Sequence, residues 1–496
     1  MPTRSRCPAD DAASHPWASG KRAMTPLPLS DALATSSLPD RERGVGALLE
    51  VERPAPNDAL KRVLELLDSA SFIPVREAVG DGVIAGTGRI AGRLVCVWAQ
   101  DPRHRGGSLG VAGGETIART IIRASRSGVP VIGIPDSAGA RLQEGVGALA
   151  AYAAIFREQA LARVPQITLV GGACAGGAAY SPALGDFVVM GGPNARLFLT
   201  GPTVIEQVTG EQTTAEALGG ARVHGANGVA QLVVGDERSW GGLLQDLLGY
   251  LPSIFGGDLP LLPALAPPPG DPAGCLPART RFVYDVRDVI RAIVDADSQL
   301  ELSQRWAPNM VTTFVRLDGR PVGILANQPR YRGGTIDSGA SQKGAWFVGL
   351  CDRLGLPMVV LVDTPGFLPG VQQERAGVIR HGAALLRAFA TAAVPRITLT
   401  LRQAFGGAHI VMNSRDLGAD LTLAWPGAEI GIMGAPQAVA LIDRAAITAG
   451  SDPIELAERY AQRLQVDAAA AGGFIDEIVA PAQTRQRLID GLEFRA

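Results

Sequence analysis

Apolar positions along most of the chain alternate between helical spacing and short runs typical of buried strands. Leu60, Val63, Leu64 and Leu67 recur at helical spacing, so residues 58–72 are predicted to form a docking helix, followed by a strand at 72–75. Beyond it, apolar runs predict strands and the alanine-rich segments between them predict helices. The runs are residues 94–98, 129–134 and 167–170. The alternation predicts an α/β layered fold rather than an all-β sandwich.

A proline-rich stretch at residues 266–272 divides the pattern into two parts. Consecutive prolines remove backbone donors and fix φ, so this stretch is predicted to be a linker. Downstream, residues 284–293 predict a helix, and two apolar runs around Asp318-Gly319 predict a hairpin. The resulting domain prediction is a first domain at 51–265 and a second at 276–496.

The pattern also occurs twice. The sequence PRHRGG at 102–107 returns as PRYRGG at 329–334, and a Gly-Gly-Ala turn at 176–178 returns at 406–408. The two turns lie slightly farther apart in sequence than the two PRxRGG segments, and a small insertion accounts for the difference. An Asp also ends an apolar run in each copy. Because order and spacing persist over roughly a hundred residues per copy, the sequence predicts a duplicated fold with two similar sites.

Charge and cysteine usage narrow the class of partner. The chain has 46 basic and 48 acidic residues without a long basic run, which gives little support to a nucleic-acid or anionic-membrane partner. Its five cysteines are odd in number and form no Cys-x-x-Cys pair. We therefore expect no disulfide framework and no zinc ribbon, and a reducing cytoplasm.

Two segments permit more than one interpretation. Residues 167–184 are uncharged and about long enough to span a membrane, but their Gly, Ala, Ser and Pro content favours a buried backbone turn. Residues 1–50 are rich in Pro, Ser, Ala and charge without a secretory apolar core, which predicts a flexible tail. Met24 is an alternative start of the protein.

The two Gly-Gly-Ala turns are the main candidates for chemistry. Each follows a predicted strand and precedes a predicted helix, and glycine lets the backbone approach a ligand closely. Aimed backbone N–H groups stabilise a developing oxyanion by roughly 3 to 4 kcal/mol per donor. The alternative is that the glycines serve helix packing. The duplication favours catalysis, so Gly176, Gly177, Gly407 and Ala408 are the predicted catalytic positions.

Other constellations are missing or ambiguous. There is no Gly-x-Ser-x-Gly, His-Glu-x-x-His or Walker motif, and the histidines are scattered, so neither a histidine triad nor a metal site is expected. His409 is either an acid or base or, more simply, a structural or specificity residue. Asp136 and Asp363 are either site residues or helix caps. The segment Tyr180-Ser181-Pro182 either lines a pocket or shapes a helix.

Six motifs resemble those of a known family, the carboxyltransferase β subunits of biotin-dependent acyl-CoA carboxylases of the acetyl-/propionyl-CoA type. They are GGSLG at 106–110, DSAGARLQEG at 136–145, CAGGAAYSPA at 174–183, WAPN at 306–309, DTPGFLPG at 363–370 and AFGGA at 404–408. The motifs are long, keep the family's order, and the resemblance runs from about residue 60 to 492.

The resemblance implies two tandem crotonase-like β-β-α spiral domains, assembled as a hexamer in which two chains share each site. It implies that acyl-CoA lies on the first domain and carboxybiotin on the second. The amides near Gly176 and Gly177 would hold the thioester enolate oxygen, and those of Gly407 and Ala408 the ureido oxygen of biotin. The implied substrate-binding residues are Ser137, Ala138, Gly139, Ala140, Arg141, Tyr180, His409 and Ile410.

The same resemblance explains why no side-chain base stands out. Carboxybiotin can release carbon dioxide, and the ureido nitrogen can then take the α-proton of the thioester before the carbanion attacks carbon dioxide, so the protein mainly orients and stabilises charge. The chain shows no biotin-attachment Met-Lys-Met and no ATP-binding carboxylase domain, so we expect a separate biotinylated α subunit. The alternatives are a biotin-dependent decarboxylase or transcarboxylase component and a non-catalytic acyl-CoA-binding paralogue.

Three positions or regions depart from the family pattern. Ala138 stands where the family usually has Gly, which adds a methyl group at the implied CoA site. Residues 1–50 and the end of the chain differ from the family's usual N-terminal helices and basic tail. Ile410 occupies a position where propionyl-preferring members often carry Asp and permissive members Ile, which indicates use of both acetyl- and propionyl-CoA. The alternative is that Ile410 packs in the core.

Overall fold

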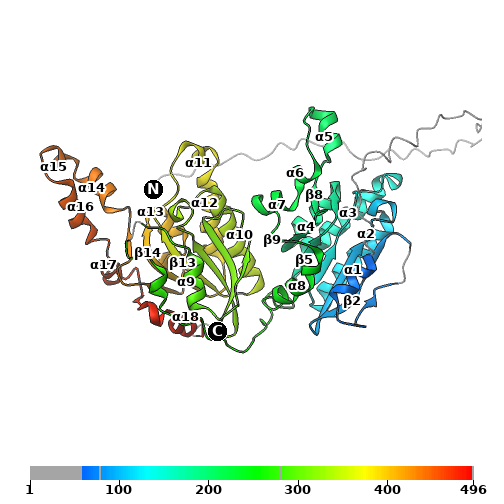
Figure 1. Cartoon of the computed structure of the whole chain (residues 1–496), viewed down its shortest axis with the longest axis horizontal. Helices are drawn as coiled ribbons and strands as arrows, with labels where there is room; N and C mark the ends of the chain where they lie inside the picture. The colour runs from blue at the N-terminus through cyan, green and yellow to red at the C-terminus, as the bar shows by residue number, and fades with distance from the viewer. Residues whose placement is uncertain (1–58, 77–79, 280–281, 494–496) are drawn as a thin grey trace, which may run out of the picture. The chain divides into compact units, whose positions relative to one another are not determined.

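The computed structural model describes residues 59–76, 80–279 and 282–493 (Figure 1), all within one unit that begins at Pro54. The predicted tail at 1–50, the alternative start at Met24 and the first residue of the predicted docking helix lie outside these residues. A helix is present there as α1 (Ala59–Leu66), but it ends at Leu66 and is shorter than predicted. Of the four apolar positions that predicted it, Val63 and Leu67 are buried, whereas Leu60 and Leu64 are exposed.

The first half is built on a seven-stranded sheet in the order β1-β2-β3-β4-β5-β7-β9. The first three strands pair antiparallel and the others parallel. The strands are β1 (Ile73–Pro74), β2 (Val83–Ile90), β3 (Arg93–Gln100), β4 (Val131–Ile134), β5 (Gln166–Val170), β7 (Phe187–Gly191) and β9 (Leu232–Val234). A small pair, β6 (Ala173–Ala175) and β8 (Arg196–Phe198), lies beside it.

Side-chain alternation along β3 divides the first half into two layers. Val95 and Val97 share a core cluster with Val63 of α1 and with α8 (Trp240–Leu248). Cys96 and Trp98 belong to a second cluster with α2 (Val111–Ser127) and α3 (Val146–Leu161). Because successive strand residues point to opposite faces, helices cover both faces of this sheet. The short helices α4 (Tyr180–Leu184), α5 (Pro202–Thr209), α6 (Ala215–Gly219) and α7 (Ala221–Asn227) complete the half.

The second half repeats this plan. Its sheet has the order β10-β11-β12-β13-β14-β15-β17, and β16 (Glu429–Gly431) pairs with the end of β14. The strands are β10 (Leu300–Leu302), β11 (Met310–Leu317), β12 (Arg320–Asn327), β13 (Met358–Thr364), β14 (Arg396–Phe405), β15 (Leu421–Ala424) and β17 (Glu477–Ile478). Apolar residues of α9 (Val286–Ile293) and α18 (Thr484–Glu493) pack on one face, and those of α10 (Ser338–Leu354) and α12 (Val378–Thr391) on the other.

Further helices extend the second half. α14 and α16 pack together beside the end of β14, and Figure 1 shows them with α15 as a group of their own. These and the remaining elements are α11 (Val371–Arg375), α13 (Gly406–Val411), α14 (Ala435–Ile442), α15 (Arg444–Thr448), α16 (Pro453–Ala461) and α17 (Val466–Ala471).

The predicted duplication is confirmed at the level of the backbone. The helices α2 and α10 have the same length and begin at the same distance after the two PRxRGG turns. Gly106 and Gly107 have φ of 65° and 68°, and Gly333 and Gly334 have φ of 62° and 78°. An added Cβ would collide with the carbonyl oxygen of Asp136 at Gly107, and with that of Asp363 at Gly334. Each PRxRGG turn therefore needs glycine for the same steric reason.

Several local predictions have clear outcomes. The hairpin is confirmed, with Leu317 paired to Arg320 and positive φ at Asp318 and Gly319, as a two-residue type I′ turn requires. Residues 167–184 form two short strands and a turn leading into α4, so the buried-turn interpretation is confirmed. Within the described part of the chain, no helix has the length and apolarity needed to cross a membrane. Residues 266–271 form neither helix nor strand, but the predicted domain boundaries stay predictions.

Candidate active site

The two Gly-Gly-Ala turns have the same local geometry. Gly176 begins a short 3-10 turn after β6 with φ of 61°, and Gly406 begins α13 after β14 with φ of 58°. The residues before them, Ala175 and Phe405, have apolar side chains that cannot cap the first N–H groups. Each turn therefore presents backbone donors that no N-cap side chain satisfies.

Steric surroundings test the alternative that these glycines serve packing. A Cβ added at Gly407 would meet the Phe367 ring at 3.6 Å, an ordinary van der Waals contact, and the residue has no positive φ. Gly407 is exposed, while the methyl group of Ala408 is buried. Packing and backbone strain do not explain glycine at position 407, which favours a role in exposing the backbone to a ligand.

The loop at 137–141 is held between the PRHRGG turn and β6. The Ser137 N–H donates to the Ala173 carbonyl at 2.7 Å, and the Leu109 N–H donates to the Gly139 carbonyl at 2.9 Å. Gly139 has φ of 105° and its N–H donates to Ser137 Oγ at 3.2 Å. The second copy reproduces this clamp, since the Ile336 N–H donates to the Gly366 carbonyl.

Arg141 points inward from this loop. Its buried guanidinium donates to Glu144 at 2.9 Å and to the carbonyls of Ser108 and Asp81 at 2.8 and 3.2 Å. The contacts shape the loop, whereas Ala138 and Ala140 on the same loop are partly exposed. The structure thus places the expected substrate-binding segment close to Gly176, because Ala175 N–H donates to the Ser137 carbonyl at 3.0 Å.

Tyr180 and Ile410 occupy equivalent positions in the two copies, just after the Gly-Gly-Ala turns. Their side chains are 52% and 48% exposed. The alternative that Ile410 packs in the core is therefore wrong. His409 is partly buried, and this burial lowers the pKa of its imidazole below the usual 6.5, with a small opposing effect from Asp416. Burial therefore disfavours the charged imidazolium form of His409.

Asp136 is held by an ion-pair cluster. Its carboxylate accepts from Arg62 Nη1 at 3.0 Å, and Arg62 also donates to both carboxylate oxygens of Glu237, at 3.0 and 2.8 Å. A Cβ added at Gly172 would lie 2.1 Å from the Asp136 carboxylate. The carboxylate thus uses space that only glycine leaves open.

Asp363, the equivalent acid of the second copy, is held by different partners. It is fully buried, accepts from Tyr284 Oη at 2.8 Å and from Arg402 Nε at 2.7 Å. Burial raises the pKa of this carboxyl group, and Arg402 opposes the rise. Arg402 stands as far before the second Gly-Gly-Ala turn as Gly172 stands before the first, so the counter-ion of the second copy replaces a glycine of the first.

The helix-cap interpretation is wrong for both acids. Gly145 is the residue that precedes α3, and Gly370 is the residue that precedes α11. Asp136 and Asp363 therefore serve as buried or half-buried anchors of the loops that follow them.

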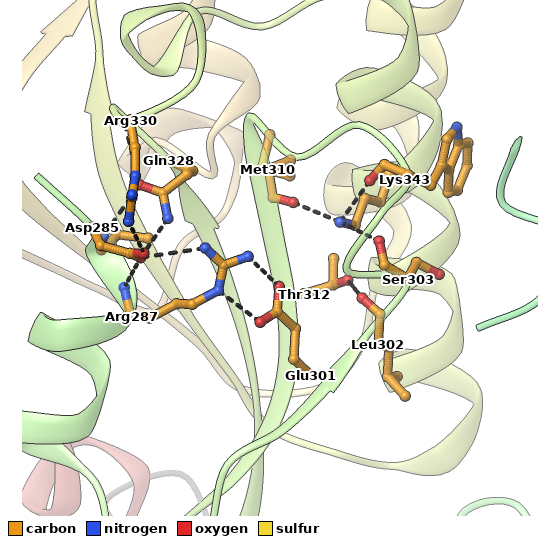
Figure 2. A network of polar contacts seen from close by, with 12 residues as sticks. Asp285, Arg287, Glu301, Leu302, Ser303, Met310, Thr312, Gln328, Arg330 and Lys343 are labelled. Atoms are coloured by element: carbon orange, nitrogen blue, oxygen red, sulfur yellow. Dashed lines mark hydrogen bonds and ion pairs between the residues drawn. The ribbon is translucent and has the colours of Figure 1, made fainter. Parts of the chain in front are cut away.

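Sequence reasoning missed a buried cation, Lys343 on α10 (Figure 2). Its side chain is fully buried and donates to the carbonyls of Ser303, Trp306 and Met310 at 2.9, 2.9 and 2.7 Å. Burial lowers the pKa of its ammonium group to about 7. The chain has only three lysines, and one that interrupts an otherwise uncharged stretch of α10 was the available signal.

Lys343 organises the WAPN motif at 306–309, because its three acceptors lie before, within and after that motif. A second network lies beside it in Figure 2: Arg287 donates to both carboxylate oxygens of Glu301, and Gln328 Nε2 donates to Asp285 at 2.6 Å. Asp285 in turn caps the start of α9. The two networks fix the strand β10 and the loop that follows it.

Among the residues that the structure describes, no three His, Cys, Asp or Glu side chains lie together in a way that could hold a metal ion. The four described cysteines, Cys96, Cys174, Cys275 and Cys351, form no disulfide. A cavity of about 580 Å³ is lined by α1, the ends of β5 and β7, and the start of α8, including Arg62, Glu237 and Trp240. The predicted site residues do not line it.

A family model and several known proteins match most of this chain. The carboxyl transferase domain model matches residues 65–496. The propionyl-CoA carboxylase beta chain of Saccharopolyspora erythraea is 41% identical over 88% of this chain and 87% of its own length. The biotin-dependent acetyl-/propionyl-coenzyme A carboxylase beta5 subunit of Mycobacterium tuberculosis is also 41% identical, over 89% and 87%.

Two further relatives have other reaction names. The methylmalonyl-CoA decarboxylase subunit alpha of Veillonella parvula is 41% identical over 88% of this chain and 90% of its own length. A solved structure of transcarboxylase 12S, described as a hexamer with methylmalonyl-coenzyme A and methylmalonic acid bound, superposes with a TM-score of 0.85. It covers 88% of this chain and 89% of the solved chain at 41% identity.

Proposed function

This chain belongs to the carboxyl transferase family and is the carboxyltransferase component of a biotin-dependent acyl-CoA carboxylase, and from that premise we propose how its two turns divide the reaction. Gly176 and Gly177 stabilise the enolate oxygen of a short-chain acyl thioester. Gly407 and Ala408 hold the ureido oxygen of biotin. Ser137, Ala138, Gly139, Ala140, Tyr180, His409 and Ile410 line the substrate, and Arg141 shapes their loop.

The observation that carries this proposal is the repeated turn. Both copies combine a left-handed first glycine with N–H groups that no N-cap side chain accepts, and Gly407 is exposed without a packing reason to be glycine. Both half-reactions pass through an oxyanion, so one turn for each half-reaction is sufficient. Each aimed donor contributes about 3 to 4 kcal/mol to a transition state.

Biotin, carried by a separate subunit, supplies the activated carboxyl group when bound. The chain's own groups orient the substrates, and burial lowers the pKa of His409, which disfavours its charged, acidic form. The exposed Gly407 leaves room for a planar ring to approach the backbone. The partner is a biotinylated α subunit, and the assembly is a hexamer like the transcarboxylase 12S core.

The exposed, uncharged side chain at Ile410 supports use of both acetyl- and propionyl-CoA. The unpaired thiols of the described cysteines suit a reducing compartment, so we place the enzyme in the cytoplasm.

The experiment is reconstitution. The full chain is mixed with its biotinylated α subunit, ATP, bicarbonate and either acetyl- or propionyl-CoA, and malonyl- or methylmalonyl-CoA is measured. We expect product with both substrates. Binding of acyl-CoA without product in the presence of a carboxylated carrier would refute the proposal and support a non-catalytic acyl-CoA-binding role.

A second candidate is the same transfer in the opposite direction, because a decarboxylase subunit matches this chain as well as the carboxylase chains do. The test supplies methylmalonyl-CoA and an uncarboxylated biotin carrier without ATP. If the kcat/KM for carboxyl transfer to the carrier is higher than that for carboxylation of the acyl-CoA, the chain functions in a decarboxylase or transcarboxylase.

A further inference from the structure

We propose that Tyr152 and Phe367 are positioning residues, each an aromatic support beneath one Gly-Gly-Ala turn, and that the two halves supply this ring from exchanged positions. The inference deepens the proposed function and rests on it. Tyr152 holds the acyl-CoA turn, and Phe367 holds the biotin turn.

In the first half the ring comes from a helix. Tyr152 lies on α3 and is buried. A Cβ added at Gly177 would lie 3.1 to 3.3 Å from Tyr152 ring atoms, so the ring lies directly against the turn. Its hydroxyl group is 3.5 Å from Ser137 Oγ, the atom that accepts the Gly139 N–H. Tyr152 therefore contacts the turn and the substrate loop together.

In the second half the ring comes from the loop. The residue equivalent to Tyr152, counted back from the Gly-Gly-Ala turn, is Gly382 on α12, which has no side chain to offer. A Cβ there would lie 3.2 Å from the Phe367 ring, and a Cβ at Gly407 would lie 3.6 Å from the same ring. Phe367 thus fills the space that Tyr152 fills in the first half.

The exchange is reciprocal. Ala140 and Phe367 occupy the same position after Asp136 and Asp363, so the first half combines a small loop residue with a helix tyrosine, and the second combines a loop phenylalanine with a helix glycine. In each half, one ring lies against the second glycine of the turn. Retention of the ring despite a changed origin indicates that the turn itself needs it, because amide donors must be held within about 0.5 Å to act on an oxyanion.

The two supports differ in one polar atom. Burial raises the pKa of the Tyr152 phenol to about 12, so its hydroxyl group stays protonated and available to Ser137. Phe367 has no equivalent group. We therefore expect the hydroxyl group to matter for the acyl-CoA side alone.

The test combines loss of the ring in the first half with an exchange built into the second, assayed in the reconstituted holoenzyme. Tyr152→Gly should lower kcat about 30-fold. Phe367→Ala should lower it similarly, and adding Gly382→Tyr should restore at least fivefold, since the new ring occupies the vacated space. Gly382→Tyr alone should be impaired because its ring would compete with Phe367. The absence of any recovery in a folded double variant would overturn the inference.

A gentler pair covers the case in which Tyr152→Gly does not fold. Tyr152→Phe keeps the ring and should retain kcat within about twofold while raising the KM for acyl-CoA about three- to tenfold, with an unchanged KM for the carboxylated carrier. Tyr250→Phe is the matched control, because this buried tyrosine also loses a hydroxyl hydrogen bond, to the Ser298 carbonyl, and contacts neither turn. Equal kinetic effects from both substitutions would overturn the inference.

The wild-type holoenzyme separates this inference from its premise. If the wild type forms no carboxylated product, the proposed function fails. If it does, and Tyr152→Gly turns over at the wild-type rate, only the positioning role fails.

Discussion

Replacing Lys343 with methionine measures what a buried cation contributes to this fold. Methionine fills a similar volume but has no donor, so the carbonyls of Ser303, Trp306 and Met310 lose their common partner. Hydrogen bonds to a charged group contribute about 1.5 to 3 kcal/mol each, or about 4.5 to 9 kcal/mol for the three. The variant also removes the cost of burying the ammonium group, which lowers the lysine pKa to about 7. This cost is about 4 kcal/mol at neutral pH, and its removal stabilises the variant.

The difference between these contributions is a net loss of about 0.5 to 5 kcal/mol in the free energy of unfolding at pH 7. The assay is equilibrium urea unfolding followed by circular dichroism. Lys61→Met is the matched control, because that lysine is 72% exposed at its side chain and its pair with Glu65 contributes little. We expect the control to change stability by less than about 0.5 kcal/mol.

The pH dependence gives an independent check. Because the folded-state pKa of Lys343 is below the unfolded value, the unfolded chain binds more protons between about pH 7 and 10. The free energy of unfolding of the wild type, relative to Lys343→Met, should therefore rise by about 1.5 kcal/mol from pH 7 to 8.5. A variant as stable as the wild type at pH 7, or a difference that shrinks as pH rises, would refute the reasoning.

Three other predictions concern the turns and the buried acids. Gly407→Ala should lower turnover at least tenfold with little change in melting temperature. The control is Gly349→Ala, an open position on α10, which should leave turnover unchanged. Matching losses of activity and stability in Gly407→Ala would restore the packing interpretation. Arg402→Met should lower the free energy of unfolding by about 3 to 5 kcal/mol, because it leaves the buried Asp363 without its counter-ion. Arg320→Met, at the exposed pair with Glu493, should lower it by less than about 1 kcal/mol. Equal losses in urea unfolding would contradict this prediction. Because the imidazole pKa of His409 is lowered in the folded state, the stability of the wild type should fall as pH drops below about 6.5. His409→Gln should therefore be less sensitive to acid. Parallel melting-temperature profiles of wild type and variant from pH 5 to 7.5 would count against this prediction.

Local patterns predicted much of the architecture and little of its polar interior. Alternating apolar runs predicted the strands β3, β4 and β5 and the β11–β12 hairpin, because these signals depend on neighbouring residues alone. The repeat also indicated where both Gly-Gly-Ala turns would lie. It could not show that Ala138 and Tyr180 are accessible while Arg141 is buried, since burial depends on the packing of distant segments.

The misassigned residues share one cause. Asp136 and Asp363 occupy equivalent places in sequence, so the same two alternatives, a site role or a helix cap, were expected for both. Their counter-ions are distant, because Arg62 lies 74 residues before Asp136 and Arg402 lies 39 residues after Asp363. Lys343 likewise has all its acceptors 33 to 40 residues upstream. Partners at such separations leave no periodic trace in a single sequence.

The order of these partners along the chain has a consequence for folding during synthesis. When Asp136 leaves the ribosome its counter-ion Arg62 has already been made, so the first half can neutralise that carboxylate as β4 joins the sheet. Asp363 emerges with only Tyr284 available and must wait for Arg402 at the far end of β14. Since domains tend to fold in the order of their translation, the first sheet can close early, whereas the second keeps an uncompensated acid until β14 is complete.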